Sequence, residues 1–442
     1  MPESSVATDK FRPRITVVYA SATGTAQDLA YRVSRVAQRH HFHVDVISVE
    51  EIRDSNQLRS AATHGPLVFL VATAGNGAFP PAAFDLWQSL LSGQLSLDNE
   101  LRGLQYAIYG LGDSTYPRFC WPERMMRKRL KDLGAVELAR DEGDEQHYLG
   151  LDGTFQPFVQ GLFEALNRSY PLPNHLHILP DEVALPPSVE LRLIKDGEAW
   201  QVKANACSAR DFKDGLTPTT QQTDDKGTRW LRLVKNQRLT SPDHFQDVRL
   251  IELETPTSSE APLQFQAGDI AALRPVNDIS DCESLLTRMG WANLRTEHIQ
   301  LWDNLRDRPV QLPPIARPPT LRREMVKDYR PTLIEYIQYH ANPFAPLRPS
   351  FFPLIRPFAT SELEREKLDE FCTPGDGYDD AMEYAVRQRR TVKEALDEFK
   401  SVQLPIERAA ECLGGQMRER EFSIASSPTV SSRTRPFESP IH

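Results

Sequence analysis

Residues 15–26 read ITVVYASATGTA, and this stretch decides how the N-terminal part of the chain folds. Its β-branched and aromatic residues predict a strand over 15–20, and the pattern that follows predicts a helix over 27–39. Only hydroxyl residues, alanines and one glycine lie between them. Such a loop offers backbone N–H groups, hydroxyls and the positive end of the helix dipole to an anion, without any lysine or arginine. The alternative is a Ser/Thr cap in an unliganded turn.

The same alternation continues through residues 14–168. Short apolar runs predict strands and longer stretches predict helices. The strands are expected at 44–49, 67–72 and 106–109, and the helices at 82–91 and 123–133. Strands that alternate with helices indicate βαβ units, and continuously apolar strands indicate burial on both faces. The sequence therefore predicts an α/β, doubly wound parallel sheet.

Two further loops follow predicted strands of this sheet. Residues 72–77 read ATAGNG, and residues 111–116 read LGDSTY. In an open α/β sheet, ligands bind outside the carboxyl ends of the strands. Glycines let the backbone approach a flat ring, and Tyr116 could stack on it or could simply cover a turn. Three such loops together favour a ligand.

Composition excludes several classes of function. The 442 residues are 40% hydrophobic and 26% charged, with a net charge of −9, which suggests two to three soluble domains and no nucleic-acid partner. No apolar run is long enough to cross a membrane, and the N-terminus has no secretory signal pattern. The scattered cysteines indicate free thiols and no metal site, so a cytoplasmic location is expected. They are Cys120, Cys207, Cys282, Cys372 and Cys412.

The rest of the chain is organised differently. Five prolines in residues 170–187 predict a stiff, extended linker, taken as 169–188. Runs that lack intervening helices, at 230–239, 245–254 and 265–275, predict an antiparallel barrel. A mostly helical insert is expected at about 281–412, inside a second domain over 189–427 that follows a first domain over 1–168. Residues 428–442 are Ser-, Pro- and Arg-rich and are expected to be disordered.

A second set of ligand-binding residues is expected near the C-terminus. Arg420-Glu421-Phe422-Ser423 places a guanidinium, an aromatic ring and a hydroxyl close together. These groups suit the pyrophosphate, the ring and the reactive edge of a flavin. Taken alone, this string is also ordinary strand sequence, and Arg389 in VRQRRTVKEA is equally typical of a solvated charge cluster.

The three N-terminal loops resemble the flavodoxin-like FMN domain of diflavin reductases. The resemblance implies that the first loop binds the FMN phosphate, that the other two loops flank the isoalloxazine ring, and that Glu145 contacts FMN. The implied residues are Ser21, Ala22, Thr23, Gly24, Thr25, Ala26, Ala72, Thr73, Ala74, Gly75, Leu111, Gly112, Asp113, Ser114, Thr115, Tyr116, Pro117, Arg118, Phe119 and Cys120. Relatives commonly carry asparagine in place of Cys120, and Ala74 leaves Tyr116 as the evident stacking aromatic.

The C-terminal string resembles the R-x-[FY]-S motif of ferredoxin reductase-type FAD domains, and the resemblance implies that Arg389, Arg420, Glu421, Phe422 and Ser423 contact FAD. The segments KNQRLTSPDHFQDVRLIEL, GDEQHYLG and REFSIASS are similar to the NADPH-dependent diflavin oxidoreductases of cytosolic iron–sulfur protein assembly. That family implies an electron path from NADPH through FAD and FMN to an anamorsin-type Fe–S protein, with no catalytic acid, base or nucleophile. A second pool of the protein in mitochondria is left open as an alternative location. The alternatives are a P450- or sulfite-reductase-like donor and a non-catalytic FMN-binding or partner-binding module.

The family pattern continues beyond Ser427 with a pyrophosphate-gripping segment and a glycine-rich NADPH domain. Neither is found in this sequence, and Gly110-Leu111-Gly112 lacks a third glycine at the spacing that a dinucleotide fingerprint requires. The expectation is a C-terminally truncated family member without the NADPH domain, inactive with NADPH and with an incomplete FAD site. A truncated product, a splice form and a faulty gene model would each explain this.

Overall fold

The structure is a computed structural model that describes residues 12–21, 23–194, 231–254, 265–312, 330–373 and 375–426. Ala22, Cys207 and the predicted tail over 428–442 therefore lie outside the described part of the chain. No helix in the described ranges is long and apolar enough to cross a membrane.

The N-terminal part is built on one five-stranded sheet. Its strands are β1 (Arg14–Ala20), β2 (His43–Ser48), β3 (Leu67–Ala72), β4 (Gln105–Gly112) and β5 (Val136–Asp144). They lie in the order β2-β1-β3-β4-β5, and every neighbouring pair is parallel. This is the flavodoxin-like strand order, which confirms the predicted doubly wound sheet. The sequence analysis did not predict β5.

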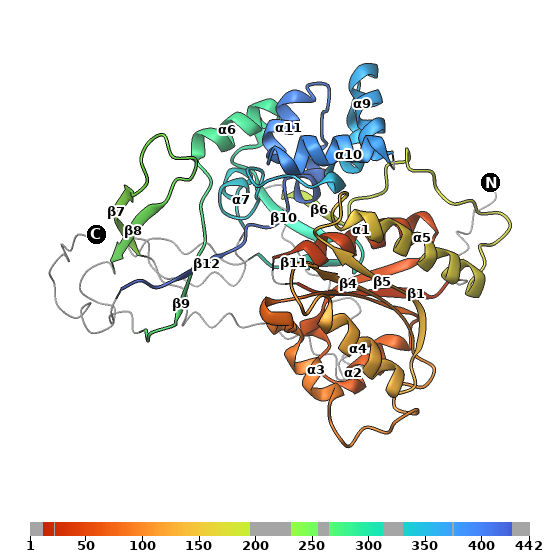
Figure 1. Cartoon of the computed structure of the whole chain (residues 1–442). Coiled ribbons are helices and arrows are strands. Elements are labelled where there is room, and N and C mark those ends of the chain that lie inside the picture. The colour runs from red at the N-terminus through yellow and green to blue at the C-terminus, as the bar shows by residue number, and fades with distance from the viewer. Residues whose placement is uncertain are drawn as a thin grey trace.

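Helices cover both faces of this sheet (Figure 1). One face carries α1 (Thr25–Arg39) and α5 (Asp152–Ser169), and the other carries α2 (Ser55–Ala62), α3 (Phe84–Leu90) and α4 (Trp121–Asp132). Side chains of β1 contribute to both cores, with Val17 on the α1 face and Val18 on the opposite face, and both are almost fully buried. Burial on both faces is why the central strands are continuously apolar.

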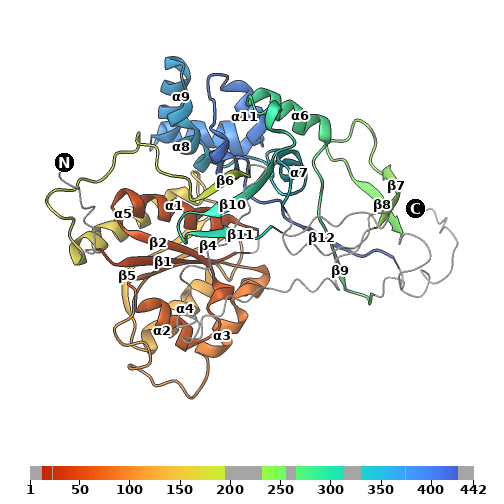
Figure 2. The ribbon, with the colours of Figure 1, turned by 180° about the vertical axis from the view of Figure 1, so that it is seen from behind.

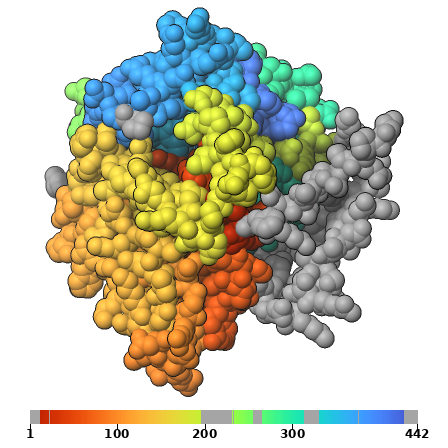
Figure 3. Space-filling model, turned by 90° about the vertical axis from the view of Figure 1, so that its right-hand side faces the viewer, coloured from red at the N-terminus to blue at the C-terminus, as the bar shows by residue number. Residues whose placement is uncertain are grey.

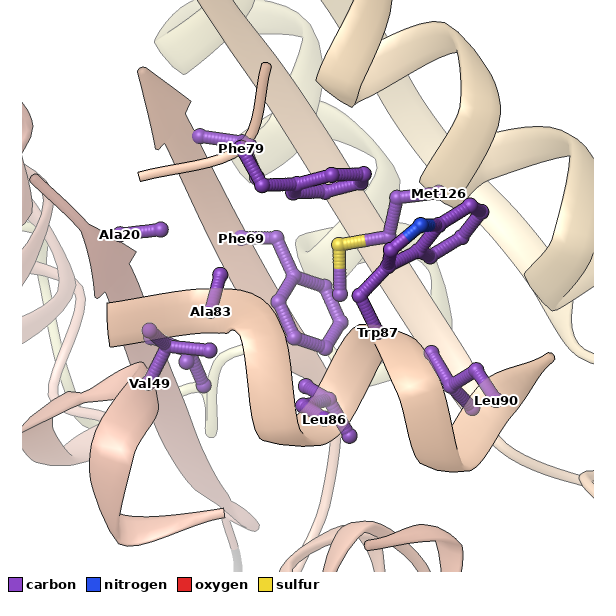
Figure 4. A pocket seen from close by; sticks show the side chains of 11 residues that line it. Ala20, Val49, Phe69, Phe79, Ala83, Leu86, Trp87, Leu90 and Met126 are labelled. Carbon is purple, nitrogen blue, oxygen red and sulfur yellow. The ribbon is translucent and has the colours of Figure 1, made fainter. Parts of the chain in front are cut away.

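A small pocket lies inside the core between the sheet and α3 (Figure 4). The ring of Phe79 stacks on Trp87 at a centroid distance of 4.7 Å, and Phe69 and Met126 also line the pocket. Its lining is aliphatic and aromatic, without an ionisable side chain. We therefore interpret it as a gap in core packing.

The C-terminal half contains three separate antiparallel sheets within the described residues. One has the order β11-β10-β6, and the others pair β7 with β8 and β9 with β12. These strands are β6 (Val189–Ile194), β7 (Arg232–Arg238), β8 (Arg249–Glu254), β9 (Ile270–Leu273), β10 (His298–Asp303), β11 (Arg308–Val310) and β12 (Arg420–Ser423). Three of the strands confirm the runs expected at 230–275. Barrel closure stays a prediction, because residues 195–230 and 255–264 lie outside the described part.

Helices dominate the region from 279 to 412, as expected, although β10 and β11 interrupt it. They are α6 (Ile279–Arg288), α7 (Leu333–Tyr339), α8 (Phe352–Ile355), α9 (Glu362–Cys372), α10 (Asp376–Met382), α11 (Val392–Glu398) and α12 (Ala409–Cys412). They share a hydrophobic core with β6 and β10, in which Phe352 is completely buried. Seen from behind, this helical region lies over the α1 and α5 face of the parallel sheet (Figure 2).

The proline-rich segment forms neither a helix nor a strand, and residues 177–185 pack against both halves of the molecule. Arg39, at the end of α1, donates to the carbonyls of Asp181 at 3.0 Å and Val183 at 3.2 Å. On the other side, Arg408 donates to the carbonyl of Leu185. In the space-filling view this yellow segment crosses the junction between the two halves (Figure 3). The predicted linker is thus a strap with fixed contacts.

Candidate functional site

The loop between β1 and α1 leads into a helix N-terminus that has no side-chain cap in the described residues. Gly24 is the N-cap residue of α1, with a φ of 94°, and no side chain among the described residues caps the first turn of the helix. The Ser21 hydroxyl instead accepts a hydrogen bond from the Gly24 N–H at 2.8 Å. The interpretation of this loop as a Ser/Thr-capped turn is therefore not supported. First-turn N–H groups without a partner are suited to an anion.

The other described residues of this loop differ in their burial, and two of them carry hydroxyls. Thr23 is exposed, Thr25 is half-buried with its hydroxyl 3.5 Å from that of Thr23, and Ala26, in the first turn of α1, is fully buried. Ala22 lies outside the described residues. The two threonine hydroxyls thus lie where they could donate to the same anion as the helix terminus.

The loop after β3 adjoins the loop after β4. The Thr73 N–H donates to the carbonyl of Leu111 at 2.9 Å, and Arg118 Nη1 donates to the carbonyl of Asn76 at 3.0 Å. Gly77 has a φ of 77°, and a Cβ there would lie 2.4 Å from the Cβ of Arg118, so the close approach requires glycine. Ala72, Ala74 and Gly75 complete the loop, with Gly75 exposed. The structure therefore brings the two predicted ring-flanking loops together.

The loop over 111–120 is held by its own acidic side chain. Asp113 accepts hydrogen bonds from the Thr115 N–H at 2.9 Å and the Thr115 hydroxyl at 2.6 Å. These bonds lower the pKa of Asp113. Tyr116 is 67% exposed at the tip of the loop, a position from which a stacked ring would cover it. Ser114, Pro117 and Arg118 are also exposed, while Leu111, Gly112 and Cys120 are buried and Phe119 is half-buried.

The segment after β5 closes the same edge of the sheet. The Glu145 N–H donates to the carbonyl of Gly112 at 2.9 Å, and Asp144 accepts from the N–H groups of Ser114 and Gln146, both at 3.0 Å. Desolvation and the carboxylates of Asp113 and Asp144 raise the pKa of Glu145. Glu145 thus lies beside the loop that carries Tyr116, and its contact with FMN stays a prediction.

A buried carboxyl that sequence analysis missed lies beneath this edge. Glu123, in the first turn of α4, is completely buried, and burial raises its pKa to about 7. Its only ion-pair partner in the described residues is Arg127, whose Nε lies 3.2 Å away. In WPERMMRKR this glutamate is typical of a solvated helix face, so the sequence carried no signal for its burial.

The second predicted set is only partly brought together. Arg420, Glu421, Phe422 and Ser423 form β12, and all four are exposed along their pairing with β9. Phe422 is 50% exposed. Arg389 lies just before α11 with a φ of 53°, and no hydrogen bond or ion pair in the described ranges links it to β12. Its role at this site stays a prediction.

Sequence analysis also missed two arginines at the first loop. Arg348 donates to the carbonyl of Gly24 at 3.2 Å, and the guanidinium of Arg418 packs against Gly24. Both side chains come from the C-terminal half of the chain. Arg348 is separated from Gly24 by 324 residues. No local pattern could have indicated this contact.

A parallel sheet with a phosphate-type loop, followed by antiparallel strands with an exposed Arg-x-Phe-Ser strand, defines a flavoprotein with two flavin domains. Comparison with known protein families supports this assignment to the flavoproteins. The Flavodoxin family matches residues 17–158, and the FAD binding domain family matches residues 222–434.

Curated relatives of this chain carry the name NADPH-dependent diflavin oxidoreductase 1. The protein from Mycosarcoma maydis is 36% identical over 95% of this chain and 65% of its own length. The protein from Gibberella zeae is 32% identical over 95% and 67%, and the one from Xenopus laevis is 32% identical over 93% and 65%. This chain thus spans about two thirds of the length of these relatives. It belongs to the NADPH-dependent diflavin oxidoreductases, an oxidoreductase family with an FMN-type flavodoxin domain and an FAD-binding domain.

The residues of the first site fit FMN. Within the described part of the chain the first turn of α1 has no side-chain cap, which leaves donors for a phosphate. The Thr73 hydroxyl is buried without a hydrogen-bond partner in the described residues, at the loop that would flank the ring. A buried polar group of this kind is rare unless a ligand or water satisfies it. The second site is less complete, since it consists here of one exposed strand.

Proposed function

We propose that this chain relays electrons between FAD, held by its C-terminal half, and FMN, held by its N-terminal half, as part of an enzyme that takes electrons from NADPH. The uncapped N-terminus of α1, joined to the hydroxyl loop over residues 21–26, is the observation that carries the proposal. When bound, the flavins supply the redox chemistry, because they can accept two electrons as a hydride and release them one at a time.

The residues of the chain bind and orient these groups. In this proposal the N–H groups and hydroxyls of residues 21–26 hold the FMN phosphate, and Thr73 donates to the flavin ring. Tyr116 stacks on the ring, and Asp113 and Asp144 hold the neighbouring loops in place through the hydrogen bonds described above.

For FAD, the Arg420 guanidinium would hold the pyrophosphate, Phe422 would stack on the ring and Ser423 would donate to its reactive edge. All three are exposed on β12 and therefore available to a ligand. No side chain is required as a general acid, a general base or a nucleophile.

The electron acceptor proposed for this chain is an anamorsin-type Fe–S protein in the cytoplasm. The proposal is supported by membership in the diflavin oxidoreductase family. A P450- or sulfite-reductase-like donor and a non-catalytic module are the competing functions.

A reconstitution experiment separates these functions. The purified chain is incubated with FMN and FAD, desalted, and its extracted flavins are quantified, with about one FMN per chain and a smaller amount of FAD expected. The flavins are then reduced with dithionite, and excess reductant is removed without oxygen. The reduced protein is mixed in a stopped-flow instrument with an oxidised anamorsin-type protein, a cytochrome P450 or a sulfite reductase haemoprotein. Fast flavin reoxidation by the Fe–S protein alone is expected.

Each alternative has its own outcome. Reoxidation mainly by one of the haemoproteins would favour the corresponding donor function. Bound flavin that none of the acceptors reoxidises would favour a binding module. A chain that retains neither flavin would contradict the proposed function altogether.

A further inference from the structure

The phosphate loop of the N-terminal half contributes no positive side chain of its own. The only charged residue in the first turn of α1 is Asp28, which is negative. A phosphate monoester carries a charge of about −1.5 to −2 at pH 7, whereas a helix N-terminus supplies only about half a positive charge. Within this half alone, the loop and Asp28 leave the charge of a phosphate poorly compensated.

Arg348, which lies between α7 and α8, reaches the loop from the C-terminal half. Its Nη1 donates to the Gly24 carbonyl at 3.2 Å, and its Nη2 lies 3.5 Å from the Thr25 hydroxyl. The same segment neutralises Asp28, since the Ser350 hydroxyl donates to the Asp28 carboxylate at 3.0 Å and Arg348 lies 3.9 Å from it. The arginine side chain is still 40% exposed, so a ligand can approach it.

Arg418 reaches the same loop from the segment that leads into β12. Its guanidinium donates to the side chain of Gln27, and an ideal Cβ on Gly24 would lie 2.5 Å from Arg418 Cζ. The guanidinium therefore packs directly on the glycine backbone. Burial and the neighbouring Arg348 lower the pKa of Arg418, because two like charges lie close together. A bound dianion would relieve this repulsion.

Backbone hydrogen bonds fix both arginines in place. Leu347, next to Arg348, donates to the carbonyl of Arg390 at 2.7 Å, and Met417, next to Arg418, donates to the carbonyl of His340 at 2.6 Å. The two guanidiniums are thus presented by well-anchored chain segments and not by free loops.

We propose that Arg348 and Arg418, supplied by the C-terminal half, complete the phosphate-binding site of FMN and select for a flavin that carries a phosphate monoester. This inference rests on the proposed function and adds the residues that determine its specificity. It also links two equilibria, because FMN binding and the docking of the two halves must strengthen each other to the same degree.

The test compares FMN with riboflavin, which has the same ring and no phosphate. Affinities of both are measured by calorimetric titration of the full chain, with saturating FAD present to occupy the other site. Arg348→Gln and Arg418→Gln are each expected to weaken FMN binding about 10-fold, the size of a lost charge-assisted hydrogen bond, and to leave riboflavin affinity unchanged. Arg348→Lys and Arg418→Lys keep the charge and should recover part of the loss.

Arg306→Gln is the matched control. Arg306 also joins the two halves, through an ion pair with Glu51, but it does so outside the phosphate loop. This variant should leave the ratio of FMN to riboflavin affinity unchanged. Thermal unfolding of each variant identifies any that fail to fold, and the lysine variants then provide the comparison.

The outcomes separate this inference from the proposed function. A smaller FMN-to-riboflavin ratio in both glutamine variants supports the inference. Equal losses for FMN and riboflavin would mean that the arginines only hold the halves together, which would overturn it. Affinities for both flavins that stay at the wild-type values would overturn it too, while leaving the proposed FMN site intact. A wild-type chain that binds neither flavin would contradict the proposed function instead.

Discussion

Arg118 Nη1 lies 3.0 Å from the backbone carbonyl of Asn76, and this hydrogen bond joins the loops that follow β3 and β4. Asn76 has a φ of 58°, so its peptide carbonyl is presented by a left-handed turn. The guanidinium also lies over the ring of Trp121 at 5.1 Å, which holds the arginine at the start of α4. One side chain therefore sets the spacing of both loops that we assign to the flavin ring.

Replacing Arg118 with alanine should weaken FMN binding by about 1 kcal/mol, since the loops lose a hydrogen bond that orders them before the ring binds. The measurement is a titration of the full chain with FMN. Arg102→Ala removes another exposed arginine of the same half and should leave the affinity unchanged. Equal affinities for the Arg118 variant and the wild type would contradict the role assigned to this contact.

Replacing both Thr23 and Thr25 with aspartate should abolish FMN binding, because two carboxylates would face the phosphate at the N-terminus of α1. Thr23→Ala with Thr25→Ala is the matched control, which removes the hydroxyls without adding charge and should only weaken binding. Flavin retained after desalting provides the measurement. FMN content at the wild-type level in the aspartate variant would rule out this loop as the phosphate site.

Replacing Tyr116 with alanine should cost about 1 kcal/mol or somewhat more of FMN affinity and should raise the fluorescence of the bound flavin. A stacked tyrosine quenches flavin emission by electron transfer, so both effects share one cause. Tyr148→Ala removes another tyrosine, 70% exposed, from the same half and serves as the control. A Tyr116 variant that changes neither quantity would place this ring away from the flavin.

Glu123 should make the folded state less stable as pH rises. Below about pH 4.5 its carboxyl is protonated in both states, and between there and about pH 7 the unfolded chain releases the proton while the folded chain keeps it. Stability from this group is therefore lost over that range, by up to about 3 kcal/mol. Glu123→Gln should abolish the loss, so its free energy of unfolding relative to wild type should rise from pH 4.5 to pH 8.

Urea unfolding at several pH values measures this difference. Glu164→Gln, at an exposed position on α5, is the matched control and should not show the rise. A Glu123 variant whose stability relative to wild type is the same at pH 4.5 and pH 8 would mean that the carboxyl ionises freely in the folded protein.

The sequence predicted those parts of the fold whose signals are local. The strand over 15–20 and the loop after it combine an apolar run, hydroxyl residues and a helix pattern in twelve consecutive residues, and the structure has β1 and α1 there. It did not predict β5, whose residues VELARDEGD are largely charged because this strand lies at the edge of the sheet.

The missed parts of the site depend on tertiary packing. The burial of Glu123 follows from its contact with Gly110, whose missing side chain lets the helix approach β4. Arg348 and Arg418 reach Gly24 only after two halves of the chain have docked, so no spacing in the sequence indicates the contact. The charged residues Glu123, Arg348 and Arg418 are each typical of an exposed segment in the sequence. Only the folded structure shows that they lie at or beneath the candidate site.

The strap over residues 177–185 limits how far the two flavin-binding halves can separate. Residues 170–188, released from all contacts, could span about 60 Å, at roughly 3.3 Å per residue. With the contacts of Arg39 and Arg408 in place, only Ala184 lies between Val183, held by the N-terminal half, and Leu185, held by the C-terminal half, a reach of about 7 Å between their Cα atoms. Arg39 and Arg408 thus determine whether the connection between the two halves is short or long. The length of this connection in turn sets the effective concentration of one half around the other.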